Sequence, residues 1–218
     1  MNSVQFKSSL PLVWYEMEFS TPHRRHSIGN VSVSDYAVDV LNESINKIDD
    51  SYSSLSADQI TSCGRQLVGS KQVFNARLPA GCILERFKTV GFLDRMVKDG
   101  DWDIEDLAAY KIDVLLDYVK MHEELIPHDA PLIGHLDDAI LVEASWRTLR
   151  TEIESYIDYR RLRKLEADLQ GKELQEFRYN RQNWLESREA ERALIKNQRE
   201  RGLSSFFSNV EVRLFHVH

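Results

Sequence analysis

Apolar residues recur at three- and four-residue spacing through most of the chain, which is the pattern of helices with one buried face. Shorter segments of this kind run over residues 38–52, 56–67, 83–97 and 103–119. A fifth segment, Leu136–Leu169, contains no proline or glycine and predicts one long helix. After Gly171, a further long segment with few apolar residues runs from Glu173 to Arg201. The chain is therefore expected to be mainly α-helical, with a long helical hairpin that turns near Gly171.

Two stretches near the ends of the chain alternate apolar with polar residues, which is the pattern of strands with one buried face. These stretches are Val13–Phe19 and Val210–Val217. Because an unpaired strand edge is a liability, we expect the two stretches to pair in a small antiparallel β-sheet. The predicted organisation is an N-terminal strand segment at 1–33, a helical core at 34–157, a charged helical arm at 158–202 and a C-terminal strand at 203–218.

Short polar residues mark several predicted helix starts. Ser34 is suited to cap the helix that follows it, and Ser56 with Gln59 has the spacing of a capping box. Asp103 is in position to cap the fourth helix. Gly202 suits the position just after a helix end, so it predicts where the last helix stops.

The connection between the fourth and fifth helices is rich in proline, glycine and titratable residues. Residues 124–138 read E-L-I-P-H-D-A-P-L-I-G-H-L-D-D. Pro127 and Pro131 keep the residues before them out of the helical region, which predicts an extended connection. Gly134 permits a left-handed conformation. Asp137 and Asp138 fall in the first helical turn, where negative charge is favoured. One interpretation is therefore purely structural, a shaped loop closed by an acidic cap.

The same stretch, with the helices on either side, resembles the YkvA-like family of small helical proteins of unknown function. The family pattern is approximately D-L-I-P-D, two residues, P, two residues, G, one residue and L-D-D. The residues that match it are Leu125, Ile126, Pro127, Pro131, Gly134, Leu136, Asp137 and Asp138. Glu124 and His128 stand where the family has aspartate, and Asp129 replaces an apolar residue. The resemblance covers residues 103–157 and implies a helical hairpin with no established activity.

Carboxylates and imidazoles are ligands for zinc, manganese and iron, so the stretch also predicts a candidate metal site. The candidate ligands are Glu124, His128, Asp137 and Asp138, with His135 and Asp129 as further candidates. His122 and His128 do not form the H-E-x-x-H motif of metalloproteases, because their spacing is wrong and a proline lies between them. A metal-dependent hydrolase is one function that fits these residues. Another hypothesis is that a histidine pairs with Asp137 or Glu124 and stabilises the loop when it is protonated.

Charge is distributed unevenly along the chain. The whole protein carries a net charge of −7, whereas residues 157–201 contain twelve basic and nine acidic side chains. This segment fits either a charged helical hairpin held by opposite charges along its own surface or an arm that binds an acidic partner. Arginine and tryptophan are enriched at the energetic centres of interfaces. The candidate partner-binding residues are Arg160, Arg161, Arg163, Lys164, Arg181, Trp184 and Arg188.

Composition indicates a cytoplasmic protein without a transmembrane segment. Cys63 and Cys82 match no zinc or redox motif, and no apolar stretch approaches the ~20 residues that a membrane helix needs. We expect a non-enzymatic interaction or adaptor module, without a cofactor, whose arm binds a protein partner or a second copy of the chain. A hydrolase that uses a divalent metal is the first alternative. Nucleic-acid binding by the arm is the second, and the acidic total disfavours it.

Overall fold

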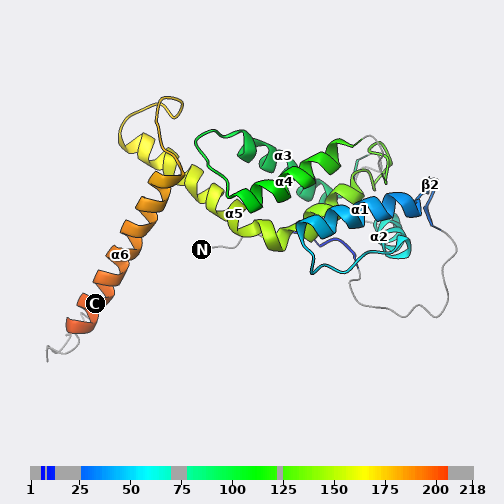
Figure 1. Cartoon of the computed structure of the whole chain (residues 1–218), viewed down its shortest axis with the longest axis horizontal. Helices are drawn as coiled ribbons and strands as arrows, with labels where there is room; N and C mark the ends of the chain where they lie inside the picture. Colours follow the sequence, from blue (N-terminus) through cyan, green and yellow to red (C-terminus); the bar gives the residue numbers. More distant parts are fainter. Residues whose placement is uncertain (1–5, 8, 13–25, 70–77, 122–124, 206–218) are drawn as a thin grey trace, which may run out of the picture. The chain divides into compact units, whose positions relative to one another are not determined.

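The computed structural model describes residues 6–7, 9–12, 26–69, 78–121 and 125–205. The chain divides into two compact units, Met1–Asp158 and Tyr159–His218. The elements in chain order are β1 (Ser27–Ile28), β2 (Val31–Ser32), α1 (Asp35–Ile48), α2 (Ala57–Gly69), α3 (Gly81–Lys98), α4 (Asp106–Lys120), α5 (Leu136–Leu169) and α6 (Arg181–Ser205) (Figure 1). The fold is mainly helical, as the hydrophobic periodicity predicts.

A two-stranded antiparallel hairpin comes before the first helix. Strands β1 and β2 pair Ser27 with Ser32 and Ile28 with Val31. Gly29 makes the turn with φ at +59°, a conformation that glycine adopts without a steric penalty. This small sheet is therefore formed by residues that are neighbours in sequence. The strands predicted at the two ends of the chain, 13–19 and 210–217, lie outside the described residues.

Two predicted helix caps are confirmed. Ser34 Oγ accepts a hydrogen bond from the Ala37 N–H at the start of α1 (3.1 Å). At the start of α2, the Ser56 N–H donates to Gln59 Oε1 (2.8 Å), and the Gln59 N–H donates to Ser56 Oγ (3.3 Å). These bonds satisfy backbone donors that have no partner inside the helix.

The start of the fourth helix differs from the prediction. Helix α4 begins at Asp106 with Glu105 as the capping residue, so Asp103 is not its cap. Leu107, which the apolar pattern assigns to the core, is 59% exposed. Successive helical residues are about 100° apart, so Leu107 lies about 140° around the helix from the buried Ile112. Leu107 therefore belongs to the solvent face of α4.

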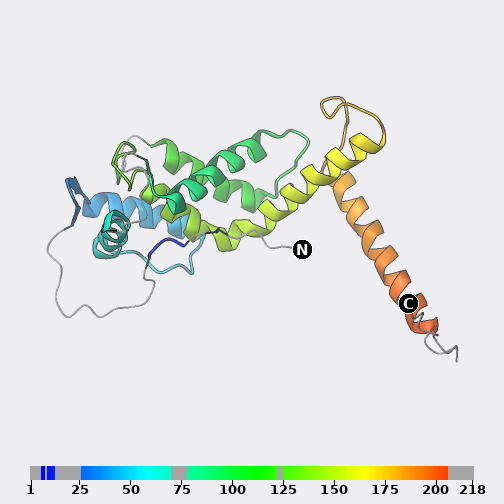
Figure 2. The same ribbon diagram turned by 180° about the vertical axis from the view of Figure 1, so that it is seen from behind.

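The first half of α5 forms the centre of the first unit. Residues Ala139 to Val142 are at most 1% exposed, so this part of the helix is buried on every face. A helix that is apolar all round must be covered on all sides. Helix α1 packs against α4, and α3 and α4 lie side by side in both views of the structure (Figure 2). The connection between α4 and α5 leads directly into this centre.

Ion pairs tie α5 to helices that lie far away in the sequence. Arg86 of α3 is buried and forms an ion pair with Glu143 (2.6 Å). Arg147 forms an ion pair with Asp49, the residue that caps the end of α1 (2.9 Å). Burial raises the pKa of Asp49, but the hydrogen bonds from Arg147 and Ser51 outweigh burial and hold the pKa below its usual value. These pairs fix the position of α5 within the first unit.

Both cysteines are buried and free. Cys63 lies on α2 and Cys82 on α3. Burial raises the pKa of Cys63 to about 12, and the nearby Cys82 acts in the same direction. Burial also raises the pKa of Cys82. The two thiols are therefore packed as small apolar side chains.

The second unit contains the end of α5, a non-helical connection and α6. Gly171 has φ at +63° just after the end of α5, in agreement with the predicted break. The connection returns toward α5, because the Tyr159 hydroxyl donates a hydrogen bond to the Tyr179 carbonyl (2.9 Å). Helix α6 starts at Arg181, later than the predicted Glu173. The aromatic residues of the connection pack on α5 instead of continuing the helix.

The start of α6 is fixed by a reciprocal cap that the apolar spacing does not show. Asn180 and Asn183 cap the start reciprocally, since each side-chain oxygen accepts the backbone N–H of the other residue (3.0 and 3.1 Å). The predicted end at Gly202 is wrong, because α6 continues to Ser205. Within the described part of the chain, no helix combines the length and the apolar content that crossing a bilayer requires.

Candidate functional site

The connection from α4 to α5 is a series of tight turns, not the extended segment that its prolines predict. The Ala130 N–H donates to the Pro127 carbonyl (2.9 Å), and the Gly134 N–H donates to the Ala130 carbonyl (2.8 Å). A Cβ atom at Gly134 would overlap the carbonyl oxygen of His128. Glycine is required at this position because the loop backbone passes directly against it. This close approach brings His128 to the start of α5.

Two residues of this connection other than glycine have left-handed backbones. Leu132 has φ at +68° and His135 has φ at +64°. Gly134, where the sequence permits this conformation, does not adopt it. A left-handed backbone costs an L-residue roughly 1–2 kcal/mol. Such strain concentrates at functional sites, and His135 is one of the candidate ligands.

Asp137 holds the loop in place from inside the protein. Its side chain is buried, and its Oδ2 accepts hydrogen bonds from the Leu125 N–H (3.1 Å) and from the Tyr118 hydroxyl (3.2 Å). Burial raises the pKa of Asp137 to about 6, and the charge of Asp138 adds to the rise, whereas backbone hydrogen bonds oppose it. Asp137 therefore joins the start of α5 to the end of α4 and to the first residue of the described loop.

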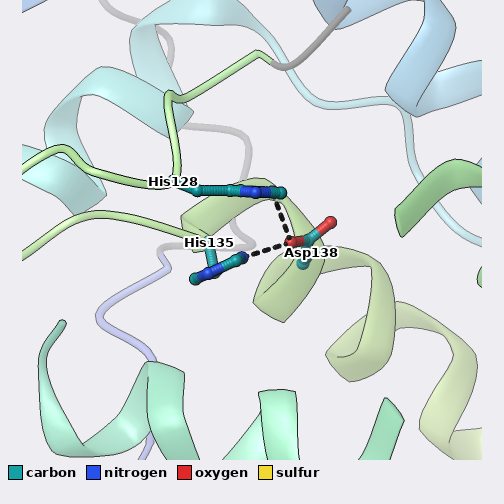
Figure 3. Close-up of side chains that lie close together, drawn as sticks. All are labelled: His128, His135 and Asp138. Atoms are coloured by element: carbon teal, nitrogen blue, oxygen red, sulfur yellow. Dashed lines mark hydrogen bonds and ion pairs between the residues drawn. The ribbon is translucent and has the colours of Figure 1, made fainter. Parts of the chain in front are cut away.

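The carboxylate of Asp138 lies beside both histidines of the connection (Figure 3). His135 Nδ1 lies 2.9 Å from Asp138 Oδ2, and His128 Nε2 lies 3.5 Å from the same oxygen. The two imidazole rings stack, with centroids 3.9 Å apart and planes 27° apart. The side chain of Asp138 is 3% exposed and that of His128 is 36% exposed, so the cluster opens to solvent on the side of His128. The protonation hypothesis pairs a histidine with Asp137 or Glu124. In the structure, both histidines lie against Asp138 instead.

Phe87 of α3 completes the surroundings of the histidine cluster. Its ring centroid lies 4.1 Å from that of His135. Two rings cannot occupy the same face of an imidazole at such distances, so His135 lies between Phe87 and His128. Phe87 carries no titratable or metal-binding group and is far from His135 in sequence, so the apolar spacing of residues 83–97 predicts only a helix at this position.

Of the candidate metal ligands, the structure brings His128, His135 and Asp138 together. One ligand atom from each residue lies within 4.8 Å of the other two. Among the described residues, no other group of three or more histidine, cysteine or acidic side chains is arranged so that it could hold a metal ion. Asp129 is exposed, and Glu124 lies outside the described residues.

The candidate partner-binding residues of the arm differ in their surroundings. Arg163 is engaged within the second unit, where it donates hydrogen bonds to the Tyr159 hydroxyl (3.2 Å) and the Phe177 carbonyl (3.3 Å). Arg188 forms an ion pair with Glu191 and is 12% exposed. The exposed residues of the set are Arg160, Arg161 and Lys164, whereas Arg181 and Trp184 are half-buried. The basic surface that is open to a partner is therefore smaller than the sequence suggests.

No protein-family model, curated protein or solved structure matches this chain. The resemblance of residues 124–138 to the YkvA-like family therefore stays a prediction from the motif. Function has to be inferred from the chemistry of two regions, the histidine–aspartate cluster of the first unit and the charged helix α6 of the second.

Proposed function

We propose that the protein is a non-enzymatic interaction module that binds a second copy of itself, with helix α6 of one copy on helix α4 of the other. The observation that carries this proposal is the exposure of α6. Residues 189–202 are all exposed, and Leu194 and Ile195 are 58% and 41% exposed. Helices in proteins gain most of their stability by packing one face against a neighbour. A partner that covers α6 would supply that packing.

One face of α6 is basic and apolar. We call it the α6 stripe; at three- and four-residue spacing it contains Leu185, Arg188, Arg192, Ile195 and Arg199. Arg192 and Arg199 form no ion pair with any described residue, whereas Lys196, beside the stripe, reaches Glu200 at 3.9 Å. The α6 stripe therefore offers two guanidinium groups around an exposed isoleucine to a partner surface.

The solvent face of α4 has the opposite charge. We call it the α4 stripe; it contains Asp106, Tyr110, Asp113 and Asp117. Tyr110 is 51% exposed, and the adjacent Leu107 is 59% exposed. None of the three aspartates pairs with a cation among residues 6–7, 9–12, 26–69, 78–121 and 125–205. Acidic side chains around exposed tyrosine and leucine are the complement of the α6 stripe.

The distribution of charge supports a second copy as the partner. Residues 1–158 contain 26 acidic and 15 basic side chains, whereas residues 159–218 contain 9 acidic and 13 basic ones. The acidic first unit of one copy can therefore attract the basic second unit of another, with α6 on the α4 of the other copy. Complementary charge of this kind steers association and fixes the register of an interface. The free thiols Cys63 and Cys82 favour the reducing cytoplasm as the place where this happens.

A charge exchange tests the proposal. We expect the wild-type protein to be a dimer by sedimentation velocity at low salt, and to dissociate as salt rises. The double variants Arg192→Glu/Arg199→Glu and Asp113→Lys/Asp117→Lys should each be monomeric, because like charges then face each other. An equimolar mixture of the two variants should form dimers again, since each reversed stripe meets its complement.

The matched control is Lys172→Glu/Arg178→Glu, which changes the charge of the second unit by the same amount at exposed residues outside α6 and should remain dimeric. A wild-type protein that is monomeric at every concentration would contradict self-association. So would a mixture of the two variants that stays monomeric. If the α6 variant instead loses binding to a DNA or RNA fragment while the wild type alone is monomeric, nucleic acid is the partner of α6 and the proposal fails.

A further inference from the structure

We propose that His128, His135 and Asp138 bind one divalent transition-metal ion, and that Zn²⁺ suits the site best. This site lies in the first unit and does not depend on the interaction proposed for α6. It replaces the ligand set suggested by the sequence, because Asp137 is engaged by the loop backbone and Tyr118. The three ligands come from two short segments, a loop and the first turn of α5, that the close approach at Gly134 brings together.

The distances between the ligand atoms suit a small metal ion. In a tetrahedral zinc site with metal–ligand bonds of about 2.0–2.1 Å, neighbouring ligand atoms are about 3.3 Å apart. The separations from Asp138 Oδ2, 2.9 Å to His135 Nδ1 and 3.5 Å to His128 Nε2, lie on either side of this value. The remaining separation is at most 4.8 Å. A shift of the more exposed His128 ring toward His135 Nδ1 is the adjustment that the ion requires.

Two of the three ligands, His135 and Asp138, are held in place before any ion binds. His135 is fixed by its left-handed backbone and by contact with the Phe87 ring on one side and the His128 ring on the other. Asp138 is buried in the first turn of α5. A binding site whose ligands are already in position loses less conformational entropy when the ion binds. The left-handed backbones of Leu132 and His135 are then the cost of presenting these ligands.

The ligand types determine which ions fit. Two imidazoles and one carboxylate favour zinc, iron and other first-row divalent ions, whereas magnesium and calcium prefer all-oxygen sites. Three protein ligands leave at least one coordination position for water or another exogenous ligand. Solvent reaches the cluster from the side of His128. The site therefore resembles open metal centres more than closed structural ones, which hold four protein ligands.

The test is a zinc titration of the full-length untagged protein after a chelator has removed bound metal. Isothermal titration calorimetry should show one equivalent of Zn²⁺, and excess Mg²⁺ should not displace it. The variants His128→Gln, His135→Gln and Asp138→Asn should each weaken zinc binding at least about tenfold, since losing even an outer-shell partner typically costs 10–100-fold. Binding should also raise the Tm of the wild type more than that of the variants at the same zinc concentration.

Two controls make the result specific. His26→Gln removes a histidine that also faces two carboxylates, Asp35 at 3.4 Å and Asp58 at 4.0 Å, and should bind zinc like the wild type. The double variant His216→Gln/His218→Gln removes the two histidines at the end of the chain and should do the same. Circular dichroism of the metal-free variants checks folding, and the half-exposed His128 is the position least needed for it.

Three results would overturn the proposal. The first is a wild-type protein that takes up well under one equivalent of Zn²⁺. The second is a folded His128→Gln variant with unchanged affinity, because His128 is essential to the proposed set. The third is loss of binding in either control variant, which would place the ion elsewhere in the chain.

Discussion

The first unit has ion pairs that cross the fold as well as pairs along single helices such as Lys47–Glu43, whereas the pairs formed by Arg188 and Lys196 run along α6 itself. Arg86 meets a carboxylate 57 residues away, and Arg147 meets one 98 residues away. In α6, Lys196 pairs with Glu200, four residues on, and Arg188 pairs with Glu191, three residues on. Local pairs support a helix but do not attach it to anything. The comparison shows why the first unit can present a precise cluster such as that of Asp138, while α6 offers only a surface.

The largest expected effect comes from Gly134→Ala in the first unit. The added Cβ would overlap the His128 carbonyl oxygen, so the backbone of the loop must move. We expect the free energy of unfolding to fall by about 3 kcal/mol, at the upper end for overpacking. Urea denaturation followed by circular dichroism measures it. A loss under about 1 kcal/mol would mean that the loop is less tightly packed than the first unit around it.

A smaller effect is expected when a long-range pair is broken by Arg147→Met. Asp49 has a lowered pKa in the folded protein, so its pairing stabilises the fold above the pKa of an unfolded aspartate, near 4, and is lost as the pH falls through the folded value. Arg147 is 71% exposed, so solvent screening makes the loss at pH 7 smaller than that expected for Gly134→Ala.

The pH dependence of that loss is the sharper test. The difference in unfolding free energy between Arg147→Met and the wild type should shrink toward zero as the pH is lowered to 3. Lys196→Met, which breaks a local pair of α6, is the matched control and should change stability by less than about 0.5 kcal/mol at either pH. Equal effects of the two substitutions would remove the distinction between long-range and local pairs.

The smallest effect, with the opposite sign, is expected for Gly202→Ala. Gly202 lies inside α6, and a Cβ there would meet no atom within 4 Å. Alanine should stabilise the helix by roughly 0.5–1 kcal/mol, because glycine loses more backbone entropy on becoming helical. Far-UV circular dichroism at increasing temperature should show α6 melting later than in the wild type. A destabilised variant would show that Gly202 is covered in solution.

Features that depend on neighbouring residues could be predicted from the sequence. The bounds of α5 match the segment free of proline and glycine, and Ser34 and the pair Ser56–Gln59 cap helices as their spacing predicts. His135 and Asp138 are three residues apart at a helix start, so their contact also lies within reach of sequence reasoning. In each case the energetics are decided by a few residues along the chain.

Features that depend on tertiary packing were missed. Nothing in the spacing distinguishes Asp137 from Asp138, yet one is bound by Tyr118 and the other faces the histidines. The left-handed backbones of Leu132 and His135 run against residue preference and persist only because the surrounding structure holds them. Helix α6 starts later than the apolar pattern predicts, because the preceding aromatic residues pack on α5 through contacts that periodicity does not show.

The burial of both cysteines gives the native protein an internal reporter of its own opening. Only a thiolate reacts with alkylating reagents, and burial with a raised pKa keeps Cys63 and Cys82 from forming one in the closed state. Alkylation must therefore wait until the packing around α2 and α3 opens, and its rate measures how often it does. Because the chain has two cysteines and both lie on these helices, opening of α6 alone leaves no trace in such a measurement. Alkylation would therefore follow the opening of the first unit without a contribution from the second.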